Sequence, residues 1–193
     1  MWYYINKRQS GITRIAGICG ILIPVVIFTC LGLSLVSSPW FIWTQHALSD
    51  LGIQQNTAVV FNNGLILGGI LALIFSLGLI TILSNKIGAY LLALSSLALI
   101  GIGLFPETIF VLHFFTSASF FVLLAIALLI IGLTVKKNSF ERKIGIFALM
   151  LALIAISSTV FLFHFEGIAI AEAFSCFPAF VWCSIVGIKM IRG

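Results

Sequence analysis

The sequence predicts an all-α membrane protein, a bundle of six transmembrane helices with both termini in the cytoplasm. Of its 193 residues, 62% are hydrophobic and 8% are charged, and the mean hydropathy is +1.27. A water-soluble domain does not bury so much apolar surface, and apolar runs of about 18 residues or more are long enough to cross a bilayer as helices. The runs lack the alternation of β-barrel strands. We therefore expect one domain over residues 1–193, with little chain outside the bilayer.

Six apolar runs set the expected helices, at about 12–36, 58–84, 87–105, 110–135, 144–163 and 168–190. Basic residues occur before the first run, between the second and third, between the fourth and fifth, and at the end of the sixth. With an even number of spans all these positions share one side, and the positive-inside rule makes that side the cytoplasm. They are Lys7, Arg8, Arg14, Lys86, Lys136, Lys137, Arg142, Lys143, Lys189 and Arg192.

This distribution predicts a multi-pass protein of the cell membrane whose partner is membrane lipid. The basic residues are scattered between helices and form no extended groove, which excludes nucleic acid as a partner. The sequence leaves the oligomeric state open. Two cysteines, Cys30 and Cys176, should lie at similar depth in the bundle, so a disulfide between them is open.

Residues 39–63 form the longest interruption of the apolar sequence. Hydroxyl residues followed by Pro39 predict a helix start, and Gly52 is a suitable stop. We therefore expect a helix over residues 39–52 that lies at the outer membrane–water boundary, where its tryptophans would settle. In such a helix His46, Ser49 and Asp50 share one face, because they are three and four residues apart.

All three histidines and four of the five acidic residues fall at or near the outer ends of the spans. Ionisable groups at membrane depth are unfavourable and usually face the bundle interior and a partner. We therefore expect a polar site that opens to the outer leaflet. Its candidates are His46, Asp50, Glu107, His113, His164, Glu166 and Glu172.

Imidazoles and carboxylates together are the ingredients of a zinc site. The expected ligands are His46 and His113, with His164 or Asp50 as the third. Glu172 or Glu107 would then act as general base to a metal-bound water, and Ser117 would orient a ligand. Such a site would hydrolyse an ester, amide or phosphodiester in a lipid or lipid-linked substrate.

Three other functions remain open. A metal-free hydrolase would use Ser49 or Ser117 as nucleophile, a histidine as base and Asp50 to orient it. A proton-coupled carrier would use Glu172 with a histidine partner. In a non-enzymatic lipid-binding, scaffold or sensor protein, Asp50 and Glu107 would cap helices and the histidines would bridge neighbouring loops.

The sequence also resembles a known family, in Leu48-Ser49-Asp50-Leu51-Gly52, Phe61-Asn62-x-Gly64-Leu65-Ile66, Gly103-Leu104-Phe105-Pro106-Glu107 and His113-x-x-x-Ser117. These look like the motifs of the polytopic family described as domain of unknown function 998. More distantly, the chain is similar to six-helix proteins of the Frag1/DRAM/Sfk1 kind. The resemblance implies a six-helix membrane fold and no particular chemistry. It supports the residues within the motifs, which are Ser49, Asp50, Glu107, His113 and Ser117.

Overall fold

A computed structural model describes residues 7–134 and 139–192, and all regular structure in these residues is helical. The long helices are α1 (Lys7–Val36), α2 (Ala58–Ile82), α3 (Ile87–Leu104), α4 (Phe110–Thr134), α5 (Ser139–Ser157) and α6 (Ala169–Arg192). Two short 3₁₀-helices, η1 (Leu48–Gly52) and η2 (Ser158–Phe163), complete the described elements. Six helices are long and apolar enough to cross a membrane, the fifth of them as α5 continued by η2. The prediction of a six-helix membrane protein is therefore confirmed.

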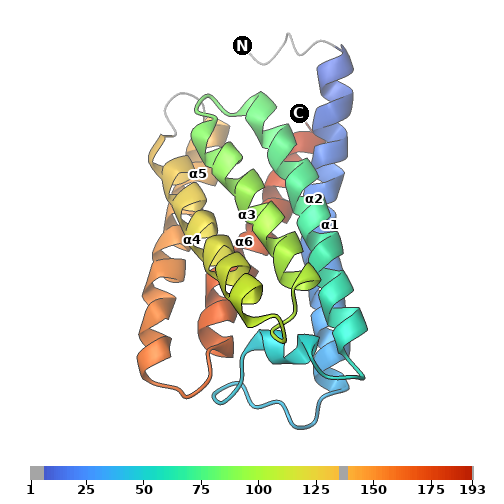
Figure 1. Ribbon diagram of the computed structural model, residues 1–193. Helices are drawn as coiled ribbons and strands as arrows, with labels where there is room; N and C mark the ends of the chain where they lie inside the picture. Colours follow the sequence, from blue (N-terminus) through green and yellow to red (C-terminus); the bar gives the residue numbers. More distant parts are fainter. Residues whose placement is uncertain (1–6, 135–138, 193) are drawn as a thin grey trace.

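The six long helices form a closed ring. Each one packs against its neighbour in the chain, and α6 packs against α1. Figure 1 shows both chain termini at one end of the bundle, which we call the terminal end. The opposite end, the loop end, carries η1 and the other residues that connect α1 to α2 (Figure 1).

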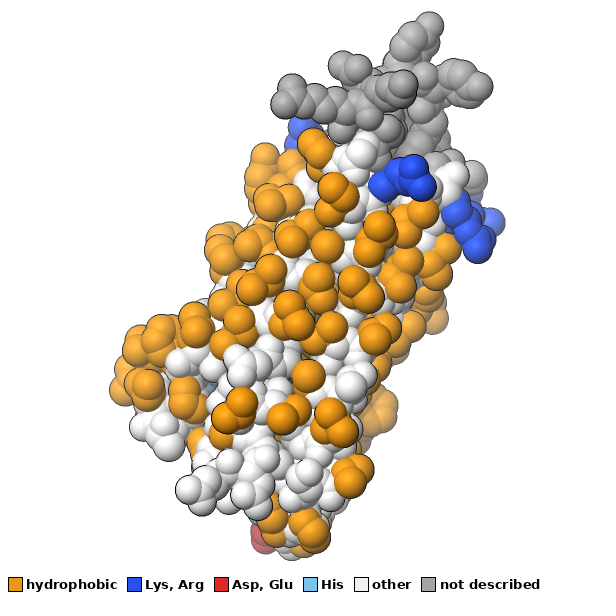
Figure 2. Space-filling model, turned by 90° about the vertical axis from the view of Figure 1, so that its right-hand side faces the viewer, with side chains coloured by type: hydrophobic (Ala, Val, Ile, Leu, Met, Phe, Trp, Pro, Cys, Tyr) orange, Lys and Arg blue, Asp and Glu red, His pale blue; other side chains and the backbone are white. Residues whose placement is uncertain are grey.

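The surface is apolar along the length of the bundle. Figure 2 shows hydrophobic side chains down the visible face and Lys and Arg side chains near the terminal end. The helix order brings to the terminal end Arg14, Lys86, Arg142, Lys143, Lys189 and Arg192. Lys136 and Lys137 lie outside the described residues. A bundle in lipid requires this distribution, because ionised side chains are tolerated at the interfaces far better than at the lipid-facing middle.

Two glycines allow the close helix contacts on which the loop end depends. A side chain at Gly64 in α2 would collide with Cys30 in α1, and one at Gly103 in α3 would lie 2.6 Å from the carbonyl oxygen of Asn62 in α2. These contacts hold α2 tightly between α1 and α3. All four cysteines are free, so the disulfide between Cys30 and Cys176 is not formed.

The predicted helix over residues 39–52 is wrong for most of its length. Residues 37–47 form turns and irregular structure, and only η1 is helical. In an α-helix the carbonyl of Thr44 would accept the N–H of Leu48. Here that carbonyl accepts the N–H of Gly167 at 2.9 Å, and the Leu48 N–H donates to Glu172. Pairing with the α5–α6 turn thus replaces the intrahelical bonds, and the shared helical face predicted for residues 46, 49 and 50 does not form.

Candidate functional site

The 3₁₀-helix η1 begins at two carboxylates. The Leu48 N–H donates to Oε2 of Glu172 at 2.7 Å, and the Ala47 N–H donates to Oδ2 of Asp50 at 3.1 Å. N–H groups at a helix start have no intrahelical partner, and a carboxylate is a favourable acceptor for them. Glu172 comes from the first turn of α6. It therefore fixes the position of η1, and with it Ser49, relative to α6.

Helix α2 holds the other end of η1. The Asn62 amide donates to the Gly52 carbonyl at 2.9 Å, and the Thr57 hydroxyl donates to the Leu51 carbonyl at 2.7 Å. A side chain at Gly52 would lie 2.5 Å from the Asn62 amide oxygen, so this close approach requires glycine. The sequence motifs over residues 48–52 and 61–66 therefore meet here.

Helix α4 brings a histidine and a serine together. His113 is 8% exposed. Its Nδ1 lies 2.8 Å from the carbonyl oxygen of Phe105, and its Nε2 lies 3.3 Å from the Ser117 hydroxyl. A carbonyl oxygen only accepts, so Nδ1 carries a proton, and in the neutral tautomer that this selects Nε2 can accept the Ser117 proton. The backbone at the end of α3 thus sets the tautomer and orientation of the imidazole.

Ser117 differs from other serines in the bundle. A hydroxyl in a membrane helix is commonly satisfied by the carbonyl four residues earlier. This is the bond made by Ser34, Ser76, Ser96 and Ser175. Within the described part of the chain, Ser117 bonds to the imidazole of His113 instead. Its hydroxyl is therefore polarised by a base.

Glu107 lies in the turn between α3 and α4, against Asp50. Burial is the largest cause that raises the pKa of Glu107, followed by the hydrogen bond to Asp50 and the charge of Asp50, with a smaller opposing effect of His113. Two carboxyl groups in contact share a proton more readily than both ionise. The Oε2 atom of Glu107 is enclosed and has no hydrogen-bond partner among the described residues.

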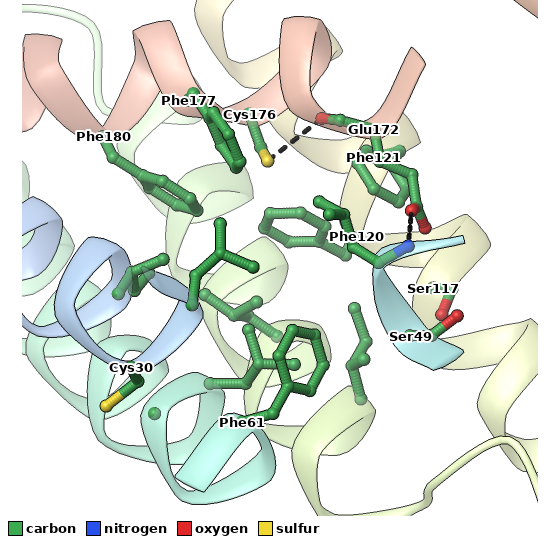
Figure 3. A pocket seen from close by; sticks show the side chains of 17 residues that line it. Cys30, Ser49, Phe61, Ser117, Phe120, Phe121, Glu172, Cys176, Phe177 and Phe180 are labelled. Atoms are coloured by element: carbon green, nitrogen blue, oxygen red, sulfur yellow. Dashed lines mark hydrogen bonds between the residues drawn. The ribbon is translucent and has the colours of Figure 1, made fainter. Parts of the chain in front are cut away.

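Two cavities meet at these side chains. The outer cavity, about 450 Å³, lies between α4, η2 and α6, and its lining includes Glu107 and His113. The inner cavity, about 60 Å³, lies within the ring and is lined mostly by apolar side chains. Figure 3 shows Ser49 and Ser117 at one corner of the inner cavity. The residues that line both cavities are Ser49, Ser117, Phe121 and Glu172.

The outer cavity is bordered by exposed apolar side chains. Phe110 and Phe114 come from α4, Leu162 from η2, and Ile168 from the turn before α6. Exposed apolar groups on a membrane-spanning bundle face lipid. The rim of the outer cavity near the loop end is therefore apolar, as a lipid-facing surface requires.

The other predicted site residues lie apart from the Ser117–His113 pair. The half-buried ring of His46 stacks on Phe41 with 5.6 Å between ring centroids, and its Nδ1 accepts the Ile42 N–H at 3.1 Å. His164 is exposed after η2, and Glu166 is exposed in the following turn. Neither cavity is lined by these three residues.

The residues present do not fit a resident zinc ion. Among residues 7–134 and 139–192, no three His, Cys, Asp or Glu side chains are arranged to hold a metal. His113 already contacts a partner through each ring nitrogen. The predicted ligand set of His46 and His113 with His164 or Asp50 is therefore not assembled, and the structure offers Asp50 as a partner of Glu107 instead.

Sequence reasoning missed one pair of hydroxyls. The side chains of Ser158 and Ser175 lie 2.7 Å apart and both line the outer cavity. Ser175 is three residues after Glu172 on α6, so helical spacing alone would have placed it on the same face. The position of Ser158 depends on the contact of η2 with α6, which no local pattern signals.

A protein-family model described as "Protein of unknown function (DUF998)" matches residues 19–189 of this chain. The matched range contains all four sequence motifs and both cavities. No curated protein and no solved structure matches the chain. The more distant similarity to the Frag1/DRAM/Sfk1 proteins stays a prediction.

Proposed function

The chain belongs to the DUF998 family of multi-pass membrane proteins, and we propose that it is a metal-free hydrolase of an ester or amide bond in a lipid or lipid-linked substrate. Ser117 is the nucleophile and His113 is its general base. The observation that carries the proposal is the hydrogen bond between Ser117 and His113 in the wall of a cavity that opens toward lipid. A hydrogen bond between a serine nucleophile and a histidine base recurs in serine hydrolases of unrelated folds.

The proposed reaction has two steps. The Ser117 Oγ forms a bond to the substrate carbonyl carbon while His113 Nε2 takes the hydroxyl proton. The bond to the leaving oxygen or nitrogen then breaks, and that atom receives the proton. Water next attacks the acyl-serine and gives a proton to His113, which returns it to Ser117. The products are a carboxylic acid and an alcohol or amine.

The neighbouring groups have separate roles. The Phe105 carbonyl orients the imidazole, which is the role that the sequence assigned to Asp50 in a metal-free hydrolase. Ser49 lines the same cavities, and no hydrogen bond of its hydroxyl is seen within the described residues, so the hydroxyl is available to the carbonyl oxygen as negative charge develops there. Glu107, which contacts Asp50, lines the outer cavity beside these residues. Glu172 is a positioning residue that holds η1 in place.

We also infer how the protein sits in the membrane. The described Lys and Arg residues lie at the terminal end. The positive-inside rule then makes this end cytoplasmic, with the bundle in the cell membrane. The outer cavity accordingly opens to the outer leaflet, so the substrate enters from the lipid of that leaflet.

A lipid-binding protein without activity is the second candidate. It is favoured by the apolar inner cavity and by the use of Glu172 and Asp50 as acceptors for the backbone of η1. It requires no reactive serine. A proton-coupled carrier has no such support. It would need polar groups along a path through the bundle, whereas the polar residues that line both cavities lie at the loop end.

A serine-reactive fluorophosphonate probe separates the candidates. We expect it to label Ser117 of the purified protein, as located by mass spectrometry of peptides. Ser117→Ala and His113→Ala should both abolish labelling while the bundle keeps its size-exclusion profile. Ser175→Ala is the matched control, because that serine lines the same cavity but donates to a backbone carbonyl. Labelling that is absent, or that does not depend on His113, would contradict the hydrolase.

A further inference from the structure

The outer cavity has acidic and aromatic walls without a basic side chain. Its ionisable lining residues are Glu107, Glu172 and His113. The carboxyl group of Asp50 contacts that of Glu107. The described Lys and Arg residues lie at the other end of the bundle. A phosphate or carboxylate headgroup in this cavity would meet carboxyl groups in a medium of low dielectric constant, with no cation to neutralise it.

One oxygen in this wall lacks a donor. The enclosed Oε2 of Glu107 has no hydrogen-bond partner within the described residues, although nearly all buried polar atoms in proteins have one. Glu107 also lines the cavity, so a cation held there lies close to this carboxyl group and to Asp50. The negative potential of the two carboxyl groups favours an N–H group or an ammonium on the ligand.

The aromatic part of the wall favours the same ligand. The rings of Phe110, Phe114 and Phe121 line the outer cavity opposite the residues of η2 and α6. The face of an aromatic ring attracts an ammonium group when the cation is removed from water. Carboxyl groups and aromatic rings in one cavity therefore select a cationic headgroup.

We propose that the outer cavity binds an amphiphile whose headgroup carries an amine or ammonium and no phosphate. Calling this ligand the substrate rests on the proposed hydrolase function, whereas its binding does not. In the bound state the cation lies near Glu107 and the phenylalanines. The bond to be cleaved lies at Ser117, which lines the same cavity.

The test measures binding by the Ser117→Ala protein, which removes turnover. The protein is kept in neutral dodecyl maltoside micelles, and dodecyltrimethylammonium or dodecyl phosphate is added as a minor component with the same tail. Binding is followed as thermal stabilisation against concentration. We expect the ammonium to stabilise the protein and the phosphate not to. Glu107→Gln replaces a carboxyl oxygen with an NH2 group that repels the cation, and should weaken binding of the ammonium by about tenfold.

Glu166→Gln is the matched control, because Glu166 is exposed and lies outside both cavities. It should leave the binding of the ammonium unchanged. Asp50→Asn is the second variant if Glu107→Gln fails to fold, and it should weaken binding in the same direction. Equal effects of Glu107→Gln and Glu166→Gln would overturn the proposal.

Two results distinguish this proposal from the hydrolase. If the fluorophosphonate labels Ser117 but the ammonium and the phosphate stabilise the protein equally, the headgroup preference is wrong and the hydrolase stands. If the ammonium binds selectively but Ser117 never reacts, the headgroup preference stands and the hydrolase is wrong.

Discussion

Replacing Glu172 tests whether a carboxylate from α6 holds η1 in place. The side chain accepts the Leu48 N–H at 2.7 Å. Glu172→Ala leaves this N–H without its partner at a helix start. A buried donor left without its acceptor costs about 1–3 kcal/mol. We therefore expect the local opening of residues 48–52 to become easier by about 2 kcal/mol.

Hydrogen exchange measures this change where it occurs. A change of about 2 kcal/mol corresponds to about 30-fold faster exchange of the Leu48 amide. Glu172→Gln keeps an acceptor oxygen of the same reach, so its effect should be smaller, about 1 kcal/mol or less. Glu166→Ala in the adjacent exposed turn is the control and should stay within about 0.5 kcal/mol of the native chain. The reasoning is refuted if Leu48 exchanges at the native rate in Glu172→Ala.

Three further predictions follow from the same contacts. Gly64→Val should destabilise the protein by about 1–3 kcal/mol, because its side chain would collide with Cys30. Gly32→Ala is the control and should be neutral, because nothing lies within 4 Å of a new Cβ there. Chemical denaturation compares the two variants, and equal stabilities would contradict the contact between α1 and α2. The raised pKa of Glu107 stabilises the folded protein at low pH. This contribution is complete below the usual value of 4.5 and is lost as the pH rises through the folded-state pKa, so stability measured against pH should fall over that range less steeply in Glu107→Gln; identical profiles would exclude the protonated pair. His46→Phe should keep the fluorophosphonate labelling of Ser117, and a chelator should leave that labelling unchanged, because the His46 ring lines neither cavity. A loss of labelling in either experiment would favour the metal site.

The helices could be predicted because lipid allows few alternatives. A chain with six long apolar runs must satisfy its backbone within each run, which makes helices the only solution for such segments. The connection between α1 and α2 had no such constraint. Its Thr44 and His46 carbonyls bond to the N–H groups of Gly167 and Ala169, more than 120 residues away in the chain. No local pattern contains that information, so the cap, proline and glycine signals predicted a helix that does not form.

The site divides in the same way between local and distant contacts. His113 and Ser117 are four residues apart on one helix, so their meeting follows from helical geometry and was predictable. The contact of Asp50 with Glu107 joins η1 to the α3–α4 turn, and depends on how the ring of helices closes. The metal hypothesis required His46, together with His164 or Asp50, to lie close to His113. The outer ends of their segments instead hold them near their own backbones, at Ile42 and Val160.

The distribution of unused hydrogen-bonding capacity separates an active site from a structural network. In a bundle in lipid, polar groups at helix ends need internal partners, and most side chains at the loop end provide them. The Phe105 carbonyl beyond α3 contacts His113, and the N–H groups at the start of η1 reach Glu172 and Asp50. A purely structural network would leave its remaining donors and acceptors scattered.

Two of the side-chain oxygens that remain without a partner instead belong to residues of the outer cavity. Of the two enclosed side-chain atoms without a partner in the described residues, the Ser38 hydroxyl lies just beyond α1, and Oε2 of Glu107 belongs to a residue of the outer cavity. The Ser49 hydroxyl, for which no hydrogen bond is seen within the described residues, lines that cavity too. Beside it, the Ser117 hydroxyl bonds to His113 and not to the carbonyl four residues earlier. A molecule bound in this cavity would give the Glu107 and Ser49 oxygens the partners that the described residues do not provide.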